Sequence, residues 1–560
     1  MRSPLWRPTA ALIAGAGLLA LAASACGGGS KSSAPGTTGA TTTTPTTTAP
    51  AKSRRGGQMK LNMSATDVDF TDPSLAYGSI SWQIEYATAL KLYNYPDKPA
   101  PEGSRILPEA ATGFPVISKD GKTYTITVKS GYKFSNGKPV TAANFAFAIN
   151  RALNPRMQSP AAAFIGNIVG AQDVLNKKAK TASGVIVNGN KITIKLTQPD
   201  GGLLAKLAMP FFQALETSLA TDPRGVNAYP SAGPYYIASR EVGRQIIVKK
   251  NPNYTGNRPR NIDQFTIAVN TNLDQSLLQV KAGQIDYDMY GLPPTAHADL
   301  AKQYGINKTQ YFVNPLVETD YVALNTSRPA FASATMRKAA NFAIDRPAML
   351  RVRGAFAGKR TDQILPPGLG GFQDQALYPM KGANYAKAKA LAGSNCKSVT
   401  LWTANSTTGQ ALGQVFKYNL SQIGCDVNVR LFQGFQIYTA AGQKGADYDA
   451  ALVGWNADYP DPYDFIDVLL NGNNIHESNN NNLSYFNNAS INKEIVAANK
   501  LTGDARYKAY GNLDIEITKA YAPWASYDNR NNREFVAKRV GGYLFQPANA
   551  SADLGTFFIK

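Results

Sequence analysis

Three aspartates, Asp458, Asp461 and Asp464, stand among aromatic residues in the stretch GWNADYPDPYDF, which runs from Gly454 to Phe465. Carboxylates grouped in this way can serve acid/base catalysis, bind a metal ion, or pair with a cation beside aromatic rings. A helix start on a wet surface has the same composition, because acidic side chains favour the first turn of a helix. The elements around the stretch help to decide among these roles.

Those elements make the stretch a loop from a strand to a helix. YDAALVG before it is a short apolar run typical of a buried strand, and FIDVLL after it has helical spacing. Asp461 precedes Pro462, which is the pattern of an N-cap followed by proline at the first helical position, and Asp464 falls in the first turn. Asp458 has no such structural role, and open α/β sheets bind ligands at loops of this kind.

The motifs of common enzymes and metal sites are missing. The two histidines, His297 and His476, are far apart and do not have the spacing of zinc or nickel ligands. GYKFSNGK departs from a phosphate-binding loop, because five residues separate its glycines where the motif has four, and Pro139 follows the lysine. Neither an enzyme built on these motifs nor a bound cofactor is therefore expected, and an extracellular hydrolase is kept as the less favoured alternative.

The whole chain has room for two or more packed cores, with 560 residues of which 44% are hydrophobic. Its net charge of +20 is spread along the sequence without a dense basic run or interleaved aromatic motif. Nucleic-acid binding is therefore not expected.

The first residues have the composition of an export signal. MRSPLWRPTAALIAGAGLLALAASAC combines two arginines, an apolar run and small residues before Cys26, and predicts a signal peptide over residues 1–25. Cys26 would then carry a lipid, and the Gly, Ser, Thr and Pro of residues 26–56 would form a disordered tether. The alternative is an ordinary signal peptide with a chance cysteine.

Two further cysteines, Cys396 and Cys425, precede the strands of one predicted unit. SVTLWT and DVNVRLF read as strands, with a helix from about 409 to 423 between them. If the strands are parallel neighbours their starts lie close together, so a disulfide is expected in an oxidising compartment. Two buried free thiols are the alternative.

A resemblance becomes specific at DGKTYTITVKSGYKFSNGKPVTAANFAFAINRALNP, where TYTITV predicts a strand and Thr141 predicts the cap of a helix. The segment resembles the signature region of the family 5 extracellular solute-binding proteins, the receptors of ATP-binding cassette importers for peptides, dipeptides and, in some branches, nickel. Further matches follow in the family's order: SAGPYYI, VKKNPNYTG, KAGQIDYDM, YVALNTSRPAFASATMRKAANFAIDRPAML and VGGY. Asn144, Ser231 and Met336 depart from the usual Asp, Gly and Val.

The resemblance implies an α/β fold with the two lobes of periplasmic binding proteins (type II, similar to cluster C) and a hinge between them. Lobe I is expected to hold residues 57–316, with an extra subdomain at about 97–225, and to take back residues 523–560. Lobe II is expected to hold residues 317–522.

The resemblance also assigns a role to Asp458. Peptide-binding members have an aspartate in the pattern Gly-Trp-x-Ala-Asp-Tyr that pairs with the α-ammonium of the ligand, and residues 454–459 match this pattern. A structural loop aspartate bonded to backbone is the alternative. The other predicted ligand contacts are Trp455 and Tyr459 of the same pattern, together with Tyr77, Trp82, Tyr290 and Trp402. Each of these last four is equally able to belong to the core. Arg530 or Arg533 is a weaker candidate for a ligand carboxylate.

The expected function is that of a receptor outside the cytoplasm. It would be a monomer, anchored by lipid to the outer face of the cytoplasmic membrane, that closes over a peptide and delivers it to the transmembrane subunits of the permease. The same fold binding a sugar, a nickel chelate or haem is the alternative.

Overall fold

The computed structural model describes residues 55–63, 67–269, 272–396, 398–501 and 503–560. Cys26, the predicted signal and all but the last two residues of the predicted tether lie outside the described residues. Strands and helices alternate along much of the described chain, and the two largest sheets each have helices packed against them.

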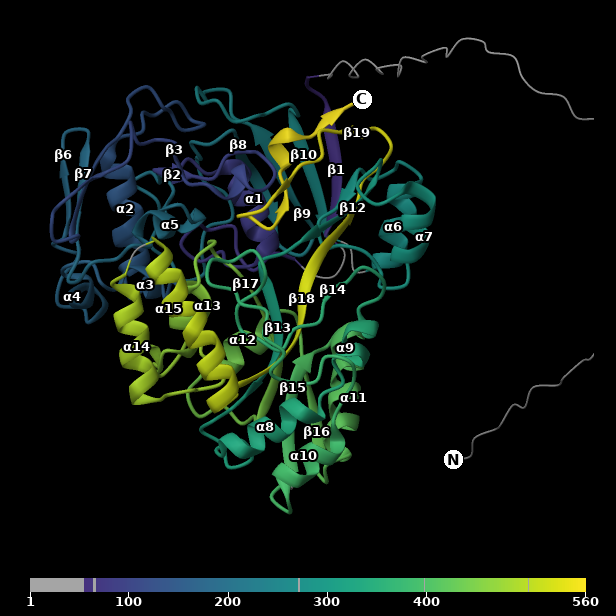
Figure 1. Ribbon diagram of the computed structural model, residues 1–560. Coiled ribbons are helices and arrows are strands. Elements are labelled where there is room, and N and C mark those ends of the chain that lie inside the picture. The colour runs from purple at the N-terminus through teal and green to yellow at the C-terminus, as the bar shows by residue number, and fades with distance from the viewer. Residues whose placement is uncertain (1–54, 64–66, 270–271, 397, 502) are drawn as a thin grey trace, which may run out of the picture. The chain divides into compact units, whose positions relative to one another are not determined.

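The first large sheet has five strands in the order β11-β1-β10-β9-β8 (Figure 1). Strand β1 lies parallel to β10 and β11, whereas β8, β9 and β10 are antiparallel neighbours. Alternate residues such as Phe265 and Ile267 are fully buried in its apolar core. The strands are β1 (Gln58–Met63), β8 (Tyr235–Glu241), β9 (Gln245–Lys250), β10 (Gln264–Val269) and β11 (Tyr287–Asp288).

A smaller sheet of four antiparallel strands, in the order β4-β5-β7-β6, packs with helix α2 (Ala142–Leu153) on a separate core. The predicted strand and helix of this region are confirmed by β5 (Thr123–Thr127) and α2. Asn144 accepts a 2.8 Å hydrogen bond from the backbone N–H of Thr141, so the asparagine caps the helix although the resemblance leads one to expect aspartate. The other strands are β4 (Val116–Ile117), β6 (Val185–Asn188) and β7 (Lys191–Lys195).

The second large sheet has the order β12-β18-β13-β17-β15-β16, with β14 paired to β18. Strands β15 and β16 are parallel neighbours joined by α11 (Thr407–Ser421), which confirms the predicted strand–helix–strand unit. A disulfide joins Cys396 and Cys425 at the start of these strands, with 4.8 Å between the Cα atoms. The strands are β12 (Tyr311–Pro315), β13 (Glu318–Leu324), β14 (Gly358–Lys359), β15 (Ser398–Ala404), β16 (Asp426–Phe432), β17 (Ala450–Asn456) and β18 (Trp524–Phe535).

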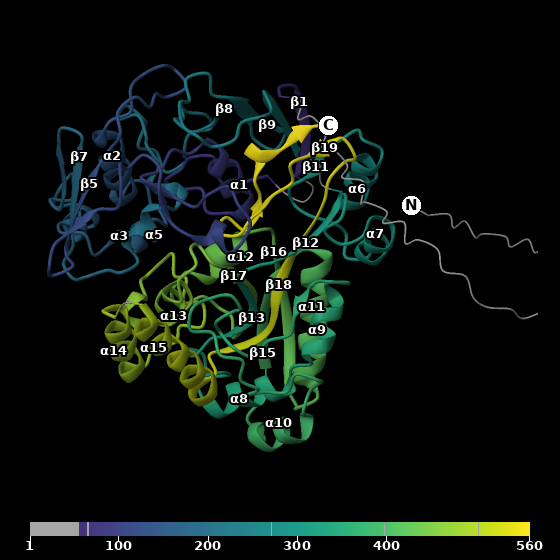
Figure 2. The same cartoon turned by 45° about the horizontal axis from the view of Figure 1, so that its top comes forward.

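Helices cover both faces of this second sheet. Leu401 and Leu452 face a core shared with α8 (Ala334–Ala343), α9 (Arg346–Val352) and α11. Trp402 and Ala451 face a core shared with α13 (Tyr463–Leu470), α14 (Ala489–Asn499) and α15 (Gly503–Glu516). The alternation places successive residues of a strand in different cores, which is why these strands read as continuous apolar runs. Figure 2 shows α9 and α11 beside β15 and β18, and α13 to α15 grouped apart from them.

Strand β18 links the two large sheets (Figure 1). Its first residues pair with β13, so that Ala323 lies opposite Trp524, and its last residues pair with β12, so that Tyr311 lies opposite Phe535. The next residue, Val536, bridges to Tyr287 in the first sheet. The strand therefore ends beside the first sheet, which the next residue reaches through a single bridge.

The remaining pairs of short strands are β2 (Tyr93–Asn94) with β3 (Leu107–Pro108), β19 (Val540–Gly541) with β22 (Phe558–Ile559), and β20 (Phe545–Gln546) with β21 (Ser551–Ala552). None of the described helices is long and apolar enough to cross a membrane. Besides α2 and α11 the α-helices are α1 (Ser79–Thr88), α3 (Ala162–Ile165), α4 (Ala171–Leu175), α5 (Leu203–Leu207), α6 (Leu273–Lys281), α7 (His297–Tyr304), α8 (Ala334–Ala343), α9 (Arg346–Val352), α10 (Tyr385–Ala392), α12 (Gln436–Ala441), α13 (Tyr463–Leu470), α14 (Ala489–Asn499) and α15 (Gly503–Glu516).

Candidate ligand-binding cleft

A cavity of about 1620 Å³ lies beside the loop that follows β17. We call it the cleft; its walls come from the loop before α1, from the region of the small sheet and from loops of the second large sheet. Pockets for a single small molecule usually measure about 300–1,000 Å³. The cleft therefore has room for a larger ligand together with water.

Asp458 lies in the wall of the cleft, on the loop between β17 and α13. Its backbone N–H donates a 2.9 Å hydrogen bond to Oδ2 of Asp464, and the indole N–H of Trp455 donates a 3.0 Å hydrogen bond to the same oxygen. Asp464 is fully buried. One buried carboxyl group thus positions both the backbone of Asp458 and the ring of Trp455.

A phenol from the opposite wall meets the Asp458 carboxyl group. The hydroxyl of Tyr77 donates a 2.6 Å hydrogen bond to Oδ2 of Asp458. The Tyr77 ring lies edge-on to Trp455 with 6.2 Å between centroids, and the centroid of the Trp82 ring is 5.7 Å from that of Tyr77. Asp458 therefore lies beside aromatic rings, where an organic cation is favourably bound.

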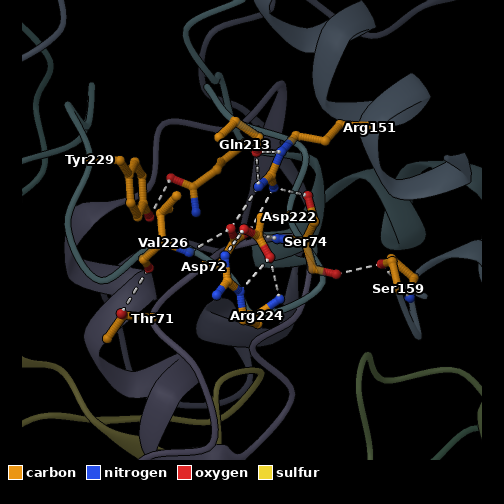
Figure 3. Close-up of polar contacts among 12 residues, drawn as sticks. Thr71, Asp72, Ser74, Arg151, Ser159, Gln213, Asp222, Arg224, Val226 and Tyr229 are labelled. Atoms are coloured by element: carbon orange, nitrogen blue, oxygen red, sulfur yellow. Dashed lines mark hydrogen bonds and ion pairs between the residues drawn. The ribbon is translucent and has the colours of Figure 1, made fainter. Parts of the chain in front are cut away.

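The loop that carries Tyr77 is anchored by a buried ion pair (Figure 3). Arg151 on α2 donates one 2.6 Å hydrogen bond to each carboxylate oxygen of Asp72, and both side chains are fully buried. The Ser159 hydroxyl donates to the backbone carbonyl of Ser74 in the same loop. These contacts bind residues 72–74 to the region of the small sheet and so restrict the position of Tyr77.

Burial controls the ionisation of the two neighbouring aspartates. Burial, followed by the adjacent Asp464, raises the pKa of Asp458 well above its ordinary value. Burial raises the pKa of Asp464 to about 7, although the hydrogen bond from Trp455 opposes this. Because two adjacent carboxylates repel each other, a cation in the cleft stabilises the ionised pair. The arrangement is suited to a ligand that carries an ammonium group.

Asp461 differs from its predicted role as the N-cap residue. Helix α13 begins at Tyr463, and Pro462 occupies the cap position. Asp461 accepts a 2.9 Å hydrogen bond from the backbone N–H of Tyr463 and forms a 2.7 Å ion pair with Arg506 on α15. The helix starts one residue later than predicted, and Asp461 joins it to α15. Asp464 does lie in the first turn, as predicted.

Of the predicted contact residues, Tyr77, Trp82, Trp455 and Asp458 line the cleft, and three others do not. Tyr459 is fully buried in the core of the small-sheet region. Trp402 packs against the rings of Phe432 and Tyr448, with centroid distances of 4.4 and 4.9 Å. Tyr290 is 41% exposed and lies outside the cleft lining. The structure thus brings four of the seven predicted contact residues together in the cleft.

Of the two arginines predicted as candidates for a ligand carboxylate, one lines the cleft and the other does not. Arg530 lines the cleft and forms a 2.8 Å ion pair with Glu318, which also lines it. Arg533 donates hydrogen bonds of 2.8 and 2.9 Å to the backbone carbonyls of Arg353 and Ala355, and does not reach the cleft.

Sequence reasoning did not anticipate two features of the cleft. The supporting role of Asp464 was hidden because its place in a helix start was already a sufficient explanation. The Glu318–Arg530 pair joins residues 212 positions apart, so no local pattern indicates it. Within the described residues, no group of three or more His, Cys, Asp or Glu is arranged to hold a metal ion.

Comparisons with known proteins extend this picture. The family model described as "Bacterial extracellular solute-binding proteins, family 5 Middle" matches residues 105–477. The probable D,D-dipeptide-binding periplasmic protein DdpA of Escherichia coli (strain K12) is 24% identical over 493 residues, which cover 86% of this chain and 90% of that protein. The dipeptide-binding protein of Lactococcus lactis subsp. cremoris is 25% identical over 491 residues, covering 79% and 85%.

Solved structures show the same architecture. The clavulanic acid biosynthesis oligopeptide binding protein 2 superposes with a TM-score of 0.82 at 22% identity, covering 90% of this chain and 96% of its own. Haemophilus influenzae OppA, solved in complex with RPPGFSPFR, superposes with a TM-score of 0.75 at 22% identity, covering 91% and 99%. These likenesses confirm the predicted α/β fold with two lobes.

Proposed function

This chain belongs to the bacterial extracellular solute-binding proteins of family 5, and from that premise we propose that it captures peptides outside the cytoplasm for an ATP-binding cassette importer. Its role is to bind and release a solute rather than to catalyse a reaction. The peptide would be passed to the transmembrane subunits of a permease. The relatives that bind dipeptides or oligopeptides by name support the choice of ligand class.

One observation carries the proposal: the Asp458 carboxyl group belongs to the cleft wall and accepts a hydrogen bond from Tyr77, whose ring lies edge-on to Trp455. A peptide α-ammonium bound there gains a charge-assisted hydrogen bond of about 1.5–3 kcal/mol. The Trp455 ring adds a cation–π interaction of about 0.5–2 kcal/mol. The ligand's peptide groups are expected to form further hydrogen bonds to the cleft walls, partly through water.

Mass spectrometry of the molecules released from the purified protein tests the ligand class. We expect peptides with free amino ends. A released sugar, haem or nickel chelate in place of peptides would overturn the proposal.

A double-mutant cycle tests the role of Asp458. The released peptide and its N-acetylated form are titrated by calorimetry against the wild type and Asp458→Asn. We expect each single change to weaken binding about tenfold to hundredfold, and the two together to weaken it little further, because both remove the same ion pair. Asp447→Asn is the control, since Asp447 is exposed, pairs with Arg328 and does not line the cleft.

We propose that the export signal ends at residue 25 and that Cys26 carries a lipid that anchors a monomer to the membrane. The lobes would be those expected from the sequence, with residues 57–316 and 523–560 in lobe I, residues 317–522 in lobe II, and the subdomain at about 97–225. Cys26→Ser should move the protein from the membrane fraction to the soluble fraction. Light scattering should give the mass of one chain.

A further inference from the structure

The charged side chains of the cleft are unequally available to a ligand. Among the described residues that line it, four are acidic and two are cationic when histidine is counted as neutral. The acidic residues are Asp69, Glu318, Asp458 and Asp467, and the cationic residues are Lys206 and Arg530. A peptide has one ammonium and one carboxylate at its ends, so the two cations are the groups able to read its carboxyl end by charge.

Lys206 already has a carboxylate partner. Its Nζ lies 2.8 Å from Oδ2 of Asp200, and the two side chains are only 3% and 1% exposed. The same ammonium lies over the ring of Tyr463 at 4.3 Å from the centroid. Moving it to a ligand carboxylate would leave Asp200 buried without its charge partner, which is strongly unfavourable.

Arg530 also has carboxylate partners, although its side chain is 37% exposed. Its Nη1 lies 2.8 Å from Oε1 of Glu318, and its Nε lies 3.8 Å from Oδ2 of Asp320. Glu318 is the largest influence that raises the pKa of Arg530. A ligand carboxylate would have to compete with two protein carboxylates for this guanidinium.

Two asparagines of the cleft wall carry hydrogen-bond acceptors that have no partner among the described residues. The amide nitrogen of Asn167 donates to Asp200 at 3.1 Å, which fixes the orientation of this side chain because a carboxylate only accepts. Its Oδ1 is then a buried acceptor without a partner among the described residues, and Oδ1 of Asn456 is another. Both residues line the cleft. Such acceptors suit N–H donors of a peptide backbone or of a carboxamide and are repelled by a carboxylate.

We propose, on the basis of the proposed function, that the cleft recognises the amino end of a peptide and does not read its carboxyl end. Its substrates are then oligopeptides whose C-terminus is free to be extended, amidated or conjugated to another group. The size of the cleft, about 1620 Å³, agrees with a ligand longer than a dipeptide.

The test uses two matched libraries of pentapeptides, one with a free C-terminal carboxylate and one with a carboxamide. The purified full chain is incubated with equal amounts of both, and the retained peptides are counted by mass spectrometry. We expect a ratio of amide to acid of about one or higher. A ratio below about one tenth would overturn this inference while leaving the proposed function intact. Retention of neither library would overturn the proposed function itself.

Two variants test the reason for the expected ratio. Glu318→Gln frees the guanidinium of Arg530, so it should shift retention about fivefold to tenfold towards the free acids. The double variant Glu318→Gln, Arg530→Gln removes both partners of the pair without changing the net charge of the cleft, so it should keep the ratio of the wild type. Selective loss of the free acids in the double variant would show that Arg530 reads the carboxylate and would contradict the inference. Thermal unfolding checks that both variants are folded.

Discussion

At the scale of single residues, Asp464 supports the cleft without lying in its wall. It accepts the indole N–H of Trp455 and the backbone N–H of Asp458 with one oxygen, while its other oxygen is buried without a partner among the described residues. An ionised carboxylate in such a place is costly. Asp464 therefore serves mainly as a hydrogen-bond acceptor that fits this space, and less as a negative charge.

We expect Asp464→Asn to gain stability relative to the wild type as the pH rises towards neutral. The pKa of Asp464 is about 7 in the folded state and near 3.9 in the unfolded state, so the folded state binds more protons and the wild type loses stability as the pH rises through this window. The asparagine keeps an acceptor and does not ionise. Urea unfolding should show the variant gaining about 1–3 kcal/mol relative to the wild type between pH 5 and pH 8. An equal difference at both pH values would contradict the raised pKa.

Peptide affinity should fall as the pH is lowered, because protons compete with the ligand ammonium for Asp458. Burial and Asp464 raise the pKa of this carboxyl group, so protonation begins above the range of an ordinary aspartate. Below that pKa we expect affinity to fall by up to about tenfold per pH unit. Calorimetry from pH 7 to pH 5 measures this, and Asp458→Asn should remove most of the dependence. A wild type whose affinity does not change with pH would show that Asp458 is not the ammonium partner.

Only some of the predicted contact residues could be located in the cleft from the sequence alone. Asp458 and Trp455 were placed in the cleft because a local pattern after a strand already singles out this loop. Tyr459 and Trp402 lie in packed cores instead. An aromatic ring suits either surrounding, so only the packing of distant elements decides between core and cleft.

At the scale of elements, the loop before α1 depends on α2 through the Asp72–Arg151 pair. We expect Arg151→Ala to reduce the free energy of unfolding by about 3–5 kcal/mol, because Asp72 is left buried and unpaired. Arg224→Ala is the control: Arg224 pairs with Asp222 nearby but is 87% exposed, so it should change stability by about 0–1 kcal/mol. Urea denaturation compares the two. Similar losses would contradict the role assigned to burial.

The disulfide at the start of β15 and β16 gives a second prediction. The bond links residues separated by 29 positions, and its removal should lower stability by about 2–4 kcal/mol. Thermal unfolding with and without a reductant measures the effect. The double variant Cys396→Ser, Cys425→Ser should be less stable and insensitive to reductant. A wild type that is equally insensitive would show that the bond is not formed in solution.

Elements were more predictable than individual contacts. Strand β5, helix α2 and the unit β15–α11–β16 follow from hydrophobic periodicity and capping signals, all of which are local. The start of α13 was predicted one residue too early, because the pairing of Asp461 with Arg506 depends on α15, 45 residues away. Local signals locate an element, and tertiary contacts adjust its ends.

At the scale of the whole molecule, contacts across the cleft join the loop before α1 and the small-sheet region to the loop and helix that follow β17. Tyr77 bonds to Asp458, Lys206 lies over Tyr463, and Tyr459 enters the core of the small-sheet region. Contacts within the protein thus stabilise the arrangement of these parts, so a ligand that favours a closed state needs to supply only the difference in free energy between that state and an open one.

We expect Tyr459→Ala to favour the open state. Removing this buried ring takes away an apolar contact across the cleft without touching its lining. Small-angle scattering should show a larger radius of gyration without peptide and a return to the wild-type value with saturating peptide. The affinity for peptide should be about tenfold weaker, because part of the binding free energy would be used to close the open state. An unchanged radius together with unchanged affinity would contradict this role.

The two-lobe fold was predictable from the order of short family motifs, whereas the contacts across the cleft were not. The order of the motifs follows the order in which the elements are connected, and the sequence gives that order directly. The hydrogen bond between Tyr77 and Asp458 joins residues 381 positions apart and depends on how two folded parts meet.

Strand β18 has a consequence for folding. The first residues of β18 pair with β13, and its last residues pair with β12. Without β18, both β12 and β13 would therefore lack backbone hydrogen-bond partners. Cutting the chain before β18 would leave unpaired edges on both sides. We therefore expect one cooperative unfolding transition and separately expressed fragments that stay insoluble until they are mixed.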